Sequence, residues 1–200
     1  MSSFADMIPV IERLERELPR FLSPDRYSHT LRVRQVAEAL GRRFSLPLLP
    51  VGLAALAHDL ERDRSHSDLL SCARERGIPL ARRDLAHPVL LHGPVAADRL
   101  RREYHVVDEA VLQAVRHHTL GHPCFAEPSH QVGQVLFVAD FCDPLRASVD
   151  GAMQEEILAL ADLPCMVREV IARTRAIFGE LEEPTEQLYA RLNGVNGNGA

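Results

Sequence analysis

Apolar residues recur every three or four positions along most of this chain, which is the spacing of one face of an α-helix. Over residues 5–18 this stripe is expected to end near Pro19, because proline interrupts a helix. Few runs alternate apolar and polar residues with period two, the pattern of a half-buried strand. The chain is therefore predicted to be all-α. Further helices are expected over about 24–43, 47–59, 88–104, 111–118, 132–140 and 152–178 and after Pro184, with short helices within 65–86.

Two segments are apolar on nearly every side, so we expect both to lie at the centre of the fold. Residues 51–57 contain no polar side chain and lead directly into His58 and Asp59. Residues 135–139 would suit a buried strand on composition alone. However, Val132, Leu136 and Asp140 follow one another at four-residue steps, which favours a helix. Both apolar segments therefore end in ionisable side chains that are expected to be buried. Burying such side chains costs free energy of desolvation unless a partner of opposite charge or a hydrogen bond offsets it.

A bound metal cation is the commonest compensation for an imidazole and a carboxylate buried side by side. Three further histidines are expected to face inward on separate helices. Taken alone, each would more often be an ordinary core or cleft residue. Together they make a cluster of four imidazoles and two carboxylates, which is too many ligands for one tetrahedral ion and suits two ions that share a carboxylate. The candidate metal ligands are His29, His58, Asp59, His92, His118 and Asp140.

Composition narrows the class of protein. The chain has 200 residues, and we expect residues 1–192 to form one domain with a substantial core. A net charge of −5 and a pI near 6.1 provide no broad basic surface, so nucleic acid is not an expected partner. No run approaches the roughly 20 apolar residues that span a membrane, and the N-terminus lacks the pattern of a signal peptide, which favours the cytoplasm. The Gly- and Asn-rich tail 193–200 is expected to be disordered.

The remaining histidines are predicted to lie outside the cluster. His117, next to His118, is a candidate for contact with a substrate or for support behind the ligands, with solvent exposure as the alternative. His87 precedes Pro88 and is expected to cap a helix. Four others lie in polar or loop-like surroundings and are expected at the surface: His66, His105, His122 and His130.

Five blocks carry the candidate ligands in chain order: Arg26–Thr30 (RYSHT), Ala57–Asp59 (AHD), Leu91–Ala97 (LHGPVAA), His118–Gly121 (HTLG) and Val138–Arg146 (VADFCDPLR). The order of histidines and aspartates resembles the HD-domain superfamily of metal-dependent phosphohydrolases. More narrowly, the blocks resemble the YqeK-type bacterial symmetrical bis(5′-nucleosyl)-tetraphosphatases. The resemblance extends over about residues 22–150. An HD pair alone is a weak signal, whereas five blocks in order are specific.

This resemblance implies an all-α HD-domain helical bundle with a two-metal centre, usually described as di-iron. Manganese, cobalt, nickel and zinc also suit a mixture of imidazole and carboxylate ligands. By position, the six candidate ligands match those of the family, with Asp59 as the bridge between two ions. Arg26, Thr119, Asp143 and Arg146 match motif positions near the metal centre and are candidates for phosphate contact or for support behind the ligands.

Two positions depart from the family pattern. Superfamily members often have a lysine three residues after the aspartate of the HD pair, near the transferred phosphoryl group. Here Arg62 occupies that position, in a chain whose 23 basic residues are all arginine. Arginine cannot donate a proton near neutral pH, so the exchange bears on rate and substrate preference. Asp143 replaces the more usual glutamate, which shortens its reach by one methylene.

The expected function is metal-dependent hydrolysis of dinucleoside polyphosphates, with diadenosine tetraphosphate cleaved symmetrically to two ADP. A metal-bound hydroxide would attack phosphorus in line while arginines neutralise charge on the nonbridging oxygens. Alternatives are an HD phosphohydrolase acting on a nucleoside monophosphate or cyclic dinucleotide, a catalytically weak nucleotide-binding or signalling module, and an all-α domain with buried histidines and no metal. The pattern predicts no oligomeric state. Candidate catalytic residues are Asp59, Arg62 and Arg146, and candidate substrate contacts are Arg26, His117, Thr119 and Asp143.

Overall fold

The computed structural model describes residues 6–147 and 149–194, and within them every regular element is a helix. The predicted all-α fold is thus confirmed. None of the described helices is long and apolar enough to cross a membrane. The α-helices are α1 (Met7–Phe21), α2 (Pro24–Arg43), α3 (Leu48–Ala57), α4 (His66–Glu75), α5 (Arg82–Ala86), α6 (His92–Glu103), α7 (Glu109–His117), α8 (Gln131–Phe141), α9 (Gly151–Ala159), α10 (Leu163–Phe178) and α11 (Glu183–Leu192), with short 3₁₀ helices η2 (Pro88–Leu91), η3 (Pro123–Ala126) and η4 (Pro128–His130).

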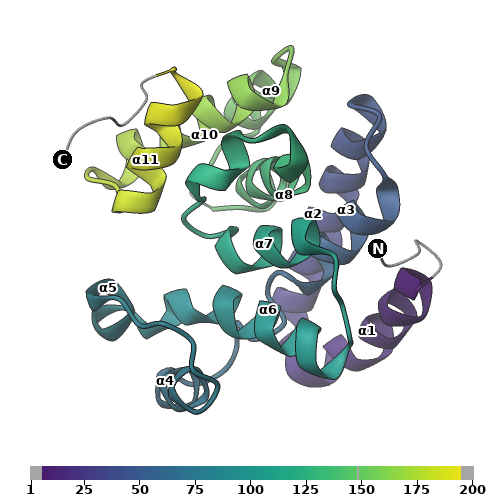
Figure 1. The fold of residues 1–200 in the computed structure, drawn as a ribbon. Helices are drawn as coiled ribbons and strands as arrows, with labels where there is room; N and C mark the ends of the chain where they lie inside the picture. The colour runs from purple at the N-terminus through teal and green to yellow at the C-terminus, as the bar shows by residue number, and fades with distance from the viewer. Residues whose placement is uncertain (1–5, 148, 195–200) are drawn as a thin grey trace.

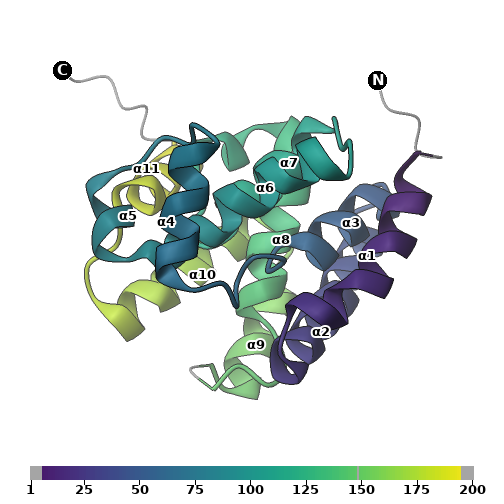
Figure 2. The same ribbon diagram turned by 90° about the horizontal axis from the view of Figure 1, so that it is seen from below.

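Helix α8 lies between the two ends of the chain. Figure 1 shows α1, α2 and α3 on one side of the molecule and α9, α10 and α11 on the other. Contacts from α8 reach α2, α3 and α7 on the first side and α10 on the second. In the view of Figure 2, α4 and α5 lie on the flank, where both pack against η2 and α4 also packs against α6. The arrangement is a bundle around α8 rather than a set of layers.

The two segments predicted to be central are buried helices. Every residue of α3 from Pro50 to Ala57 is buried, and so are all but two residues of α8. A helix that is apolar all round has no face to turn toward water, so it is driven into the core. Because α3 is buried from Pro50 to its end, the residues that follow it, His58 and Asp59, lie inside the protein rather than at its surface.

Gly93 allows α6 and α7 to approach closely. A Cβ atom at this position would lie 2.9 Å from the backbone carbonyl oxygens of both Val115 and Arg116 on α7, which is closer than non-bonded atoms tolerate. Both neighbouring groups belong to the helix backbone and cannot move aside as a flexible side chain would. The contact lies one residue after His92 and a few residues before His118, so the spacing of these two histidines depends on it.

The structure corrects two helix boundaries. Helix α1 continues past Pro19 to Phe21. Pro19 is exposed in the last turn, where a proline removes one hydrogen bond without breaking a longer helix. The predicted helix over 152–178 is divided into α9 and α10, because the carboxylate of Asp162 accepts a hydrogen bond from the backbone N–H of Cys165 and starts a new helix. Most of the predicted disordered tail lies outside the described residues, apart from positions 193 and 194.

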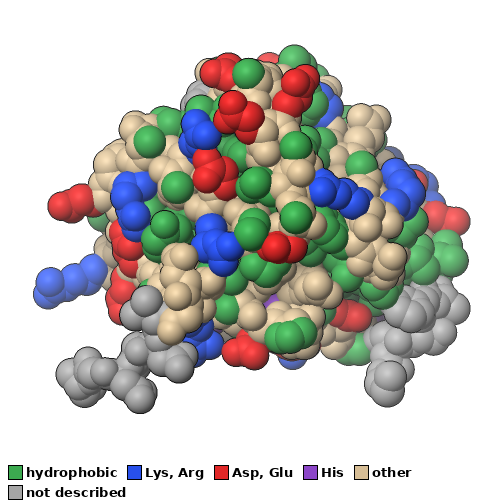
Figure 3. Space-filling model, turned by 90° about the horizontal axis from the view of Figure 1, so that it is seen from above, with side chains coloured by type: hydrophobic (Ala, Val, Ile, Leu, Met, Phe, Trp, Pro, Cys, Tyr) green, Lys and Arg blue, Asp and Glu red, His purple; other side chains and the backbone are tan. Residues whose placement is uncertain are grey.

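The surface mixes charges of both signs. On the face drawn in Figure 3, arginines and acidic side chains are interspersed among apolar ones, without a broad field of one sign. Many helix arginines pair with a nearby carboxylate, as Arg102 does with Asp98 at 2.9 Å and Arg175 with Glu186 at 2.6 Å. Such exposed pairs contribute little to stability individually. They do mean that much of the positive charge is neutralised locally.

We predict that Gly93→Ala lowers the free energy of unfolding by about 1–3 kcal/mol, because the added methyl group overpacks a backbone contact. Gly151→Ala is the matched control, since a Cβ there meets nothing within 4 Å. It should leave stability unchanged or raise it slightly. Urea denaturation of both variants and of the unmodified chain measures the difference. Equal stability of Gly93→Ala and Gly151→Ala would show that the α6–α7 approach is not constrained at this position.

Candidate metal centre

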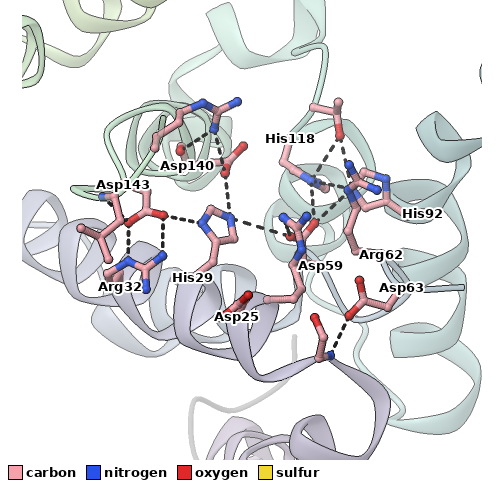
Figure 4. A pocket seen from close by; sticks show the side chains of 15 residues that line it. Asp25, His29, Arg32, Asp59, Arg62, Asp63, His92, His118, Asp140 and Asp143 are labelled. Carbon is pink, nitrogen blue, oxygen red and sulfur yellow. Dashed lines mark hydrogen bonds and ion pairs between the residues drawn. The ribbon is translucent and has the colours of Figure 1, made fainter. Parts of the chain in front are cut away.

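The six candidate ligands come from five helices and converge on one cavity. His29 lies on α2, the His58–Asp59 pair follows α3 and His92 begins α6, while the other two come from the ends of α7 and α8. Figure 4 shows the side chains of five of them directed toward one another: His29, Asp59, His92, His118 and Asp140. The cavity has a volume of about 500 Å³, and five of the six ligands line it, while His58 is completely buried behind it. The ligands lining the cavity are His29, Asp59, His92, His118 and Asp140.

The carboxylate of Asp59 lies between two pairs of imidazoles. Its Oδ1 atom is 3.2 Å from Nε2 of His92 and 3.7 Å from Nε2 of His118. Its Oδ2 atom is 3.5 Å from Nε2 of His58 and 3.7 Å from Nε2 of His29. Each pair together with Asp59 forms a group whose ligand atoms could hold one metal ion. One carboxylate with a histidine pair at each oxygen is the arrangement of a bridging ligand.

Three of the imidazoles are held in the same way by the backbone. The Nδ1 atoms of His58, His92 and His118 lie 2.7, 2.5 and 2.8 Å from the carbonyl oxygen three residues earlier in the chain. A carbonyl oxygen only accepts hydrogen bonds, so Nδ1 carries the proton in each ring. The lone pair of each ring is then on Nε2, which faces the centre. This is the tautomer and orientation required of a metal ligand.

Few proton donors reach these lone pairs among the described residues: the hydroxyl of Thr119 lies 3.2 Å from Nε2 of His118 and 3.5 Å from Nε2 of His92. Nε2 of the fully buried His58 has no hydrogen-bond partner, and Nε2 of His92 lies 3.0 Å from Nε2 of His118. Burial lowers the pKa of His58 to about 4 and also lowers the pKa of His92, so both rings are neutral at pH 7. Facing lone pairs repel unless a cation lies between them. The nitrogen and oxygen donors present therefore fit a divalent transition metal.

The two carboxylates are held in their charged forms. Burial by itself would raise the pKa of Asp59, but the neighbouring imidazoles of His58, His118 and His92 hold it well below its usual value. The pKa of Asp140 is likewise lowered despite burial, through a hydrogen bond with His29 and the positive charge of Arg146. Two ionised carboxylates inside the protein add to the demand for positive charge at the centre.

His29 is oriented by a carboxylate instead of a carbonyl group. Its Nδ1 atom lies 2.7 Å from Oδ2 of Asp143, and its Nε2 atom lies 3.1 Å from Oδ1 of Asp140. Arg32 donates two hydrogen bonds to Asp143, at 2.6 and 2.9 Å. The carboxylate of Asp143 is buried and both its oxygens are engaged. Asp143 thus lies behind His29, in the supporting position that was one of the two roles expected for it, and it also lines the cavity, so its contact with substrate stays a prediction.

Arg32 was not singled out in the sequence, although a signal existed. It lies three residues after His29 on α2, so both side chains lie on the same side of that helix. Its partner Asp143 is 111 residues away in the chain. The pairing therefore becomes visible only when α2 and the segment after α8 are brought together.

The predicted phosphate contacts mostly line the same cavity. Arg26 donates a hydrogen bond to Oδ2 of Asp59 at 3.0 Å, and Arg146 donates to the backbone carbonyl of Asp140 at 2.8 Å. The exposed Thr119 hydroxyl lies 3.2 Å from Nε2 of His118. Arg62 also lines the cavity. Together with Arg32, four guanidinium groups surround the centre, which suits an anionic ligand such as a polyphosphate.

His117 lies outside this cavity. Successive residues at a helix end point about 100° apart, so while His118 faces the centre, His117 lines a different cavity of about 410 Å³. There it stacks on His122, with ring centroids 4.2 Å apart, and burial lowers its pKa to about 3. His117 therefore does not line the metal cavity, its contact with a substrate stays a prediction, and His122 is half-buried rather than at the surface. Of the other histidines, His66 and His105 are exposed as predicted, His130 is half-buried, and His87 precedes η2 without a capping hydrogen bond from its side chain.

Comparison with known proteins gives consistent results. The family profile described as HD domain matches residues 26–145. A protein of Bacillus subtilis named "Bis(5′-nucleosyl)-tetraphosphatase, symmetrical" is 31% identical over 163 residues, which cover 82% of this chain and 84% of that protein. A protein of the same name from Staphylococcus aureus is 30% identical over 137 residues, 68% of each chain.

A solved structure has the same fold. It is described as a predicted HD superfamily hydrolase involved in NAD metabolism from Clostridium acetobutylicum, and it superposes with a TM-score of 0.82 over 92% of this chain and 97% of that one. At 22% sequence identity this similarity concerns the fold alone. The family profile and the sequence relatives carry the assignment further. This chain belongs to the HD-domain family of phosphohydrolases.

Proposed function

We propose that this protein hydrolyses dinucleoside polyphosphates and cleaves diadenosine tetraphosphate symmetrically to two ADP. The observation that carries the proposal is the sharing of Asp59 between two histidine pairs at the base of a cavity lined by arginines. The names of the relatives support the substrate and the symmetry of cleavage. A centre of this kind suits in-line attack on a phosphorus atom.

The proposed centre holds two cations. One would be bound by His29, His58 and Asp59, and the other by Asp59, His92 and His118, with Asp140 beside His29 as a sixth ligand. Iron is the proposed metal, and manganese, cobalt, nickel and zinc suit the same donors. When bound, such ions lower the pKa of a coordinated water toward neutrality and neutralise charge on phosphoryl oxygens.

The arginines around the cavity bind and orient the phosphate chain. Arg62 lies three residues after Asp59 and makes no ion pair within residues 6–147 and 149–194, so its guanidinium is free to take a phosphate. Arg146 is anchored to the backbone carbonyl of Asp140, which directs it along one wall. A guanidinium can hold two phosphate oxygens at once. Since it stays protonated, its role is to stabilise charge and not to transfer a proton.

Asp143 and Arg32 position His29. The carboxylate accepts the Nδ1 proton of His29, which leaves Nε2 as the nitrogen directed at the centre. Burial would raise the pKa of Asp143, but its bonds with Arg32 and His29 lower it. Partners of this type behind a metal ligand commonly affect metal affinity or activity by about 10–100-fold.

We predict that Asp59→Asn removes most bound metal and abolishes hydrolysis. An amide cannot supply a charged oxygen to each of two cations, and it leaves the four imidazoles without their common anion. The matched control is Asp25→Asn, an exposed aspartate on the rim of the same cavity. Metal content by mass spectrometry should fall only in the first variant. Metal content retained by Asp59→Asn would contradict the assignment of a shared ligand.

We predict that the metal-loaded protein converts diadenosine tetraphosphate to ADP as the only nucleotide product. Chromatography of a nucleotide panel checks this, with nucleoside monophosphates and cyclic dinucleotides as competing substrates. Formation of ATP and AMP would exclude symmetrical cleavage. Cleavage of a monophosphate or a cyclic dinucleotide while the tetraphosphate remains intact would assign the protein to another activity within the family.

We predict that Asp143→Asn lowers turnover or metal affinity by about 10–100-fold without unfolding the protein. Glu38→Gln serves as control, because it removes an ion pair with Arg34 on the same helix, away from the cavity. Steady-state kinetics, metal titration and the unfolding midpoint separate the effects. If both variants lost only stability, Asp143 would have a structural role and no positioning role.

A further inference from the structure

A second, apolar cavity of about 240 Å³ adjoins the metal cavity. The two share four lining residues, His118, Thr119, Asp140 and Arg146. The shared residues include two candidate metal ligands, His118 and Asp140, so this space lies next to the candidate metal centre. The other walls come from α8 and from the C-terminal part of the chain: Phe137, Phe141, Val170, Thr174, Phe178, Glu180, Leu181, Glu182 and Thr185.

Phe178 and the turn after it form the outer wall. Phe178 ends α10 and is 64% exposed. A single exposed aromatic side chain is common and needs no explanation by itself. The informative observation is that Phe178 lines a cavity next to the polar metal centre. Gly179 follows with φ of 86°, a conformation that favours glycine, and it directs the chain from α10 toward α11. The turn brings Leu181 to the cavity while two carboxylates, those of Glu180 and Glu182, lie at its rim.

We propose that this cavity is the subsite for one nucleobase of the substrate. The inference rests on the proposed function in taking a nucleotide as the ligand of the metal centre. A volume of about 240 Å³ is below the roughly 300 Å³ at which pockets for drug-sized ligands begin. It therefore has room for a base but not for a whole nucleotide, and the phosphates remain in the larger cavity.

The chemistry of the walls matches a base. Aromatic and aliphatic side chains supply flat apolar contact, on which bases stack irrespective of their identity. The hydroxyls of Thr174 and Thr185 donate to backbone carbonyls at 2.8 and 2.7 Å, so their protons are already used. The carboxylates of Glu180 and Glu182 remain as acceptors for an exocyclic amino group. The guanidinium of Arg146, 5.6 Å from the ring centre of Phe141, stands at the junction with the phosphate site.

The cavity around His117 and His122 is the competing location. It is larger, about 410 Å³, but of the residues lining the metal cavity it includes only Thr119. Its lining includes two arginines, Arg83 and Arg116, and lacks a phenylalanine. The aromatic cavity therefore fits a base better, and the histidine cavity provides a matched alternative for the experiment.

The test compares binding of ADP and of pyrophosphate to the full-length, metal-loaded protein by titration calorimetry. Pyrophosphate carries the phosphates without the base. We expect the unmodified protein to bind ADP more tightly than pyrophosphate. Phe178→Ala should weaken ADP binding by about 5- to 150-fold and leave pyrophosphate binding unchanged. Phe178→Trp should retain the affinity for ADP, and Ile8→Ala, an exposed apolar residue of α1, serves as control.

Three results would overturn the proposal: unchanged ADP binding in Phe178→Ala, an equal loss for ADP and pyrophosphate, or a selective loss of ADP binding in His122→Ala instead. The outcome is separable from that of the proposed function. If the protein failed to cleave diadenosine tetraphosphate but Phe178→Ala lost ADP affinity selectively, the base subsite would stand. If it cleaved the tetraphosphate and Phe178→Ala bound ADP normally, only the subsite would be wrong.

Discussion

The burial of one carboxylate among four imidazoles is the constraint on which the site depends. Asp59 is 2% exposed, and each of its oxygens faces a pair of Nε2 atoms. Second protons on His58 and His92 do not satisfy this cluster at neutral pH, because burial lowers the pKa of both rings, and the backbone already holds their first protons on Nδ1. Cations can satisfy it. The polar cluster therefore has a chemical purpose that a packing role would not explain.

The fold forms this cluster by bringing the ends of several helices together, so that the side chains at those ends meet in one cavity. Buried helix α3 carries His58 and Asp59 into the interior, and Gly93 lets α6 and α7 bring two further histidines within 3.0 Å of each other. Around the rim, arginines face the cavity while many surface arginines are paired. Catalytic groups on rigid helix ends need little rearrangement before substrate binds, which favours a preorganised electrostatic site.

Sequence patterns predicted the helices and the six side chains that converge, but not most of the contacts that support them. Apolar runs on α3 and α8, each leading to an aspartate, were enough to locate the centre. The partners of Asp143 could not be read from the sequence, because its bonds with His29 and Arg32 join segments more than 100 residues apart. His117 lies in a different cavity from His118, since adjacency in the sequence does not show the direction of a side chain. The break before α10 had a local signal, an aspartate cap followed by proline, that helical periodicity obscured.

Anomalous X-ray diffraction from crystals of the metal-loaded protein, recorded at the absorption edge of the metal found, tests the central claim most directly. The account predicts two peaks, one at each oxygen of Asp59 and about 3.5–4 Å apart. One should lie against His29 and His58, and the other against His92 and His118. A single peak that does not touch Asp59, or no peak within reach of its carboxylate, would contradict the account.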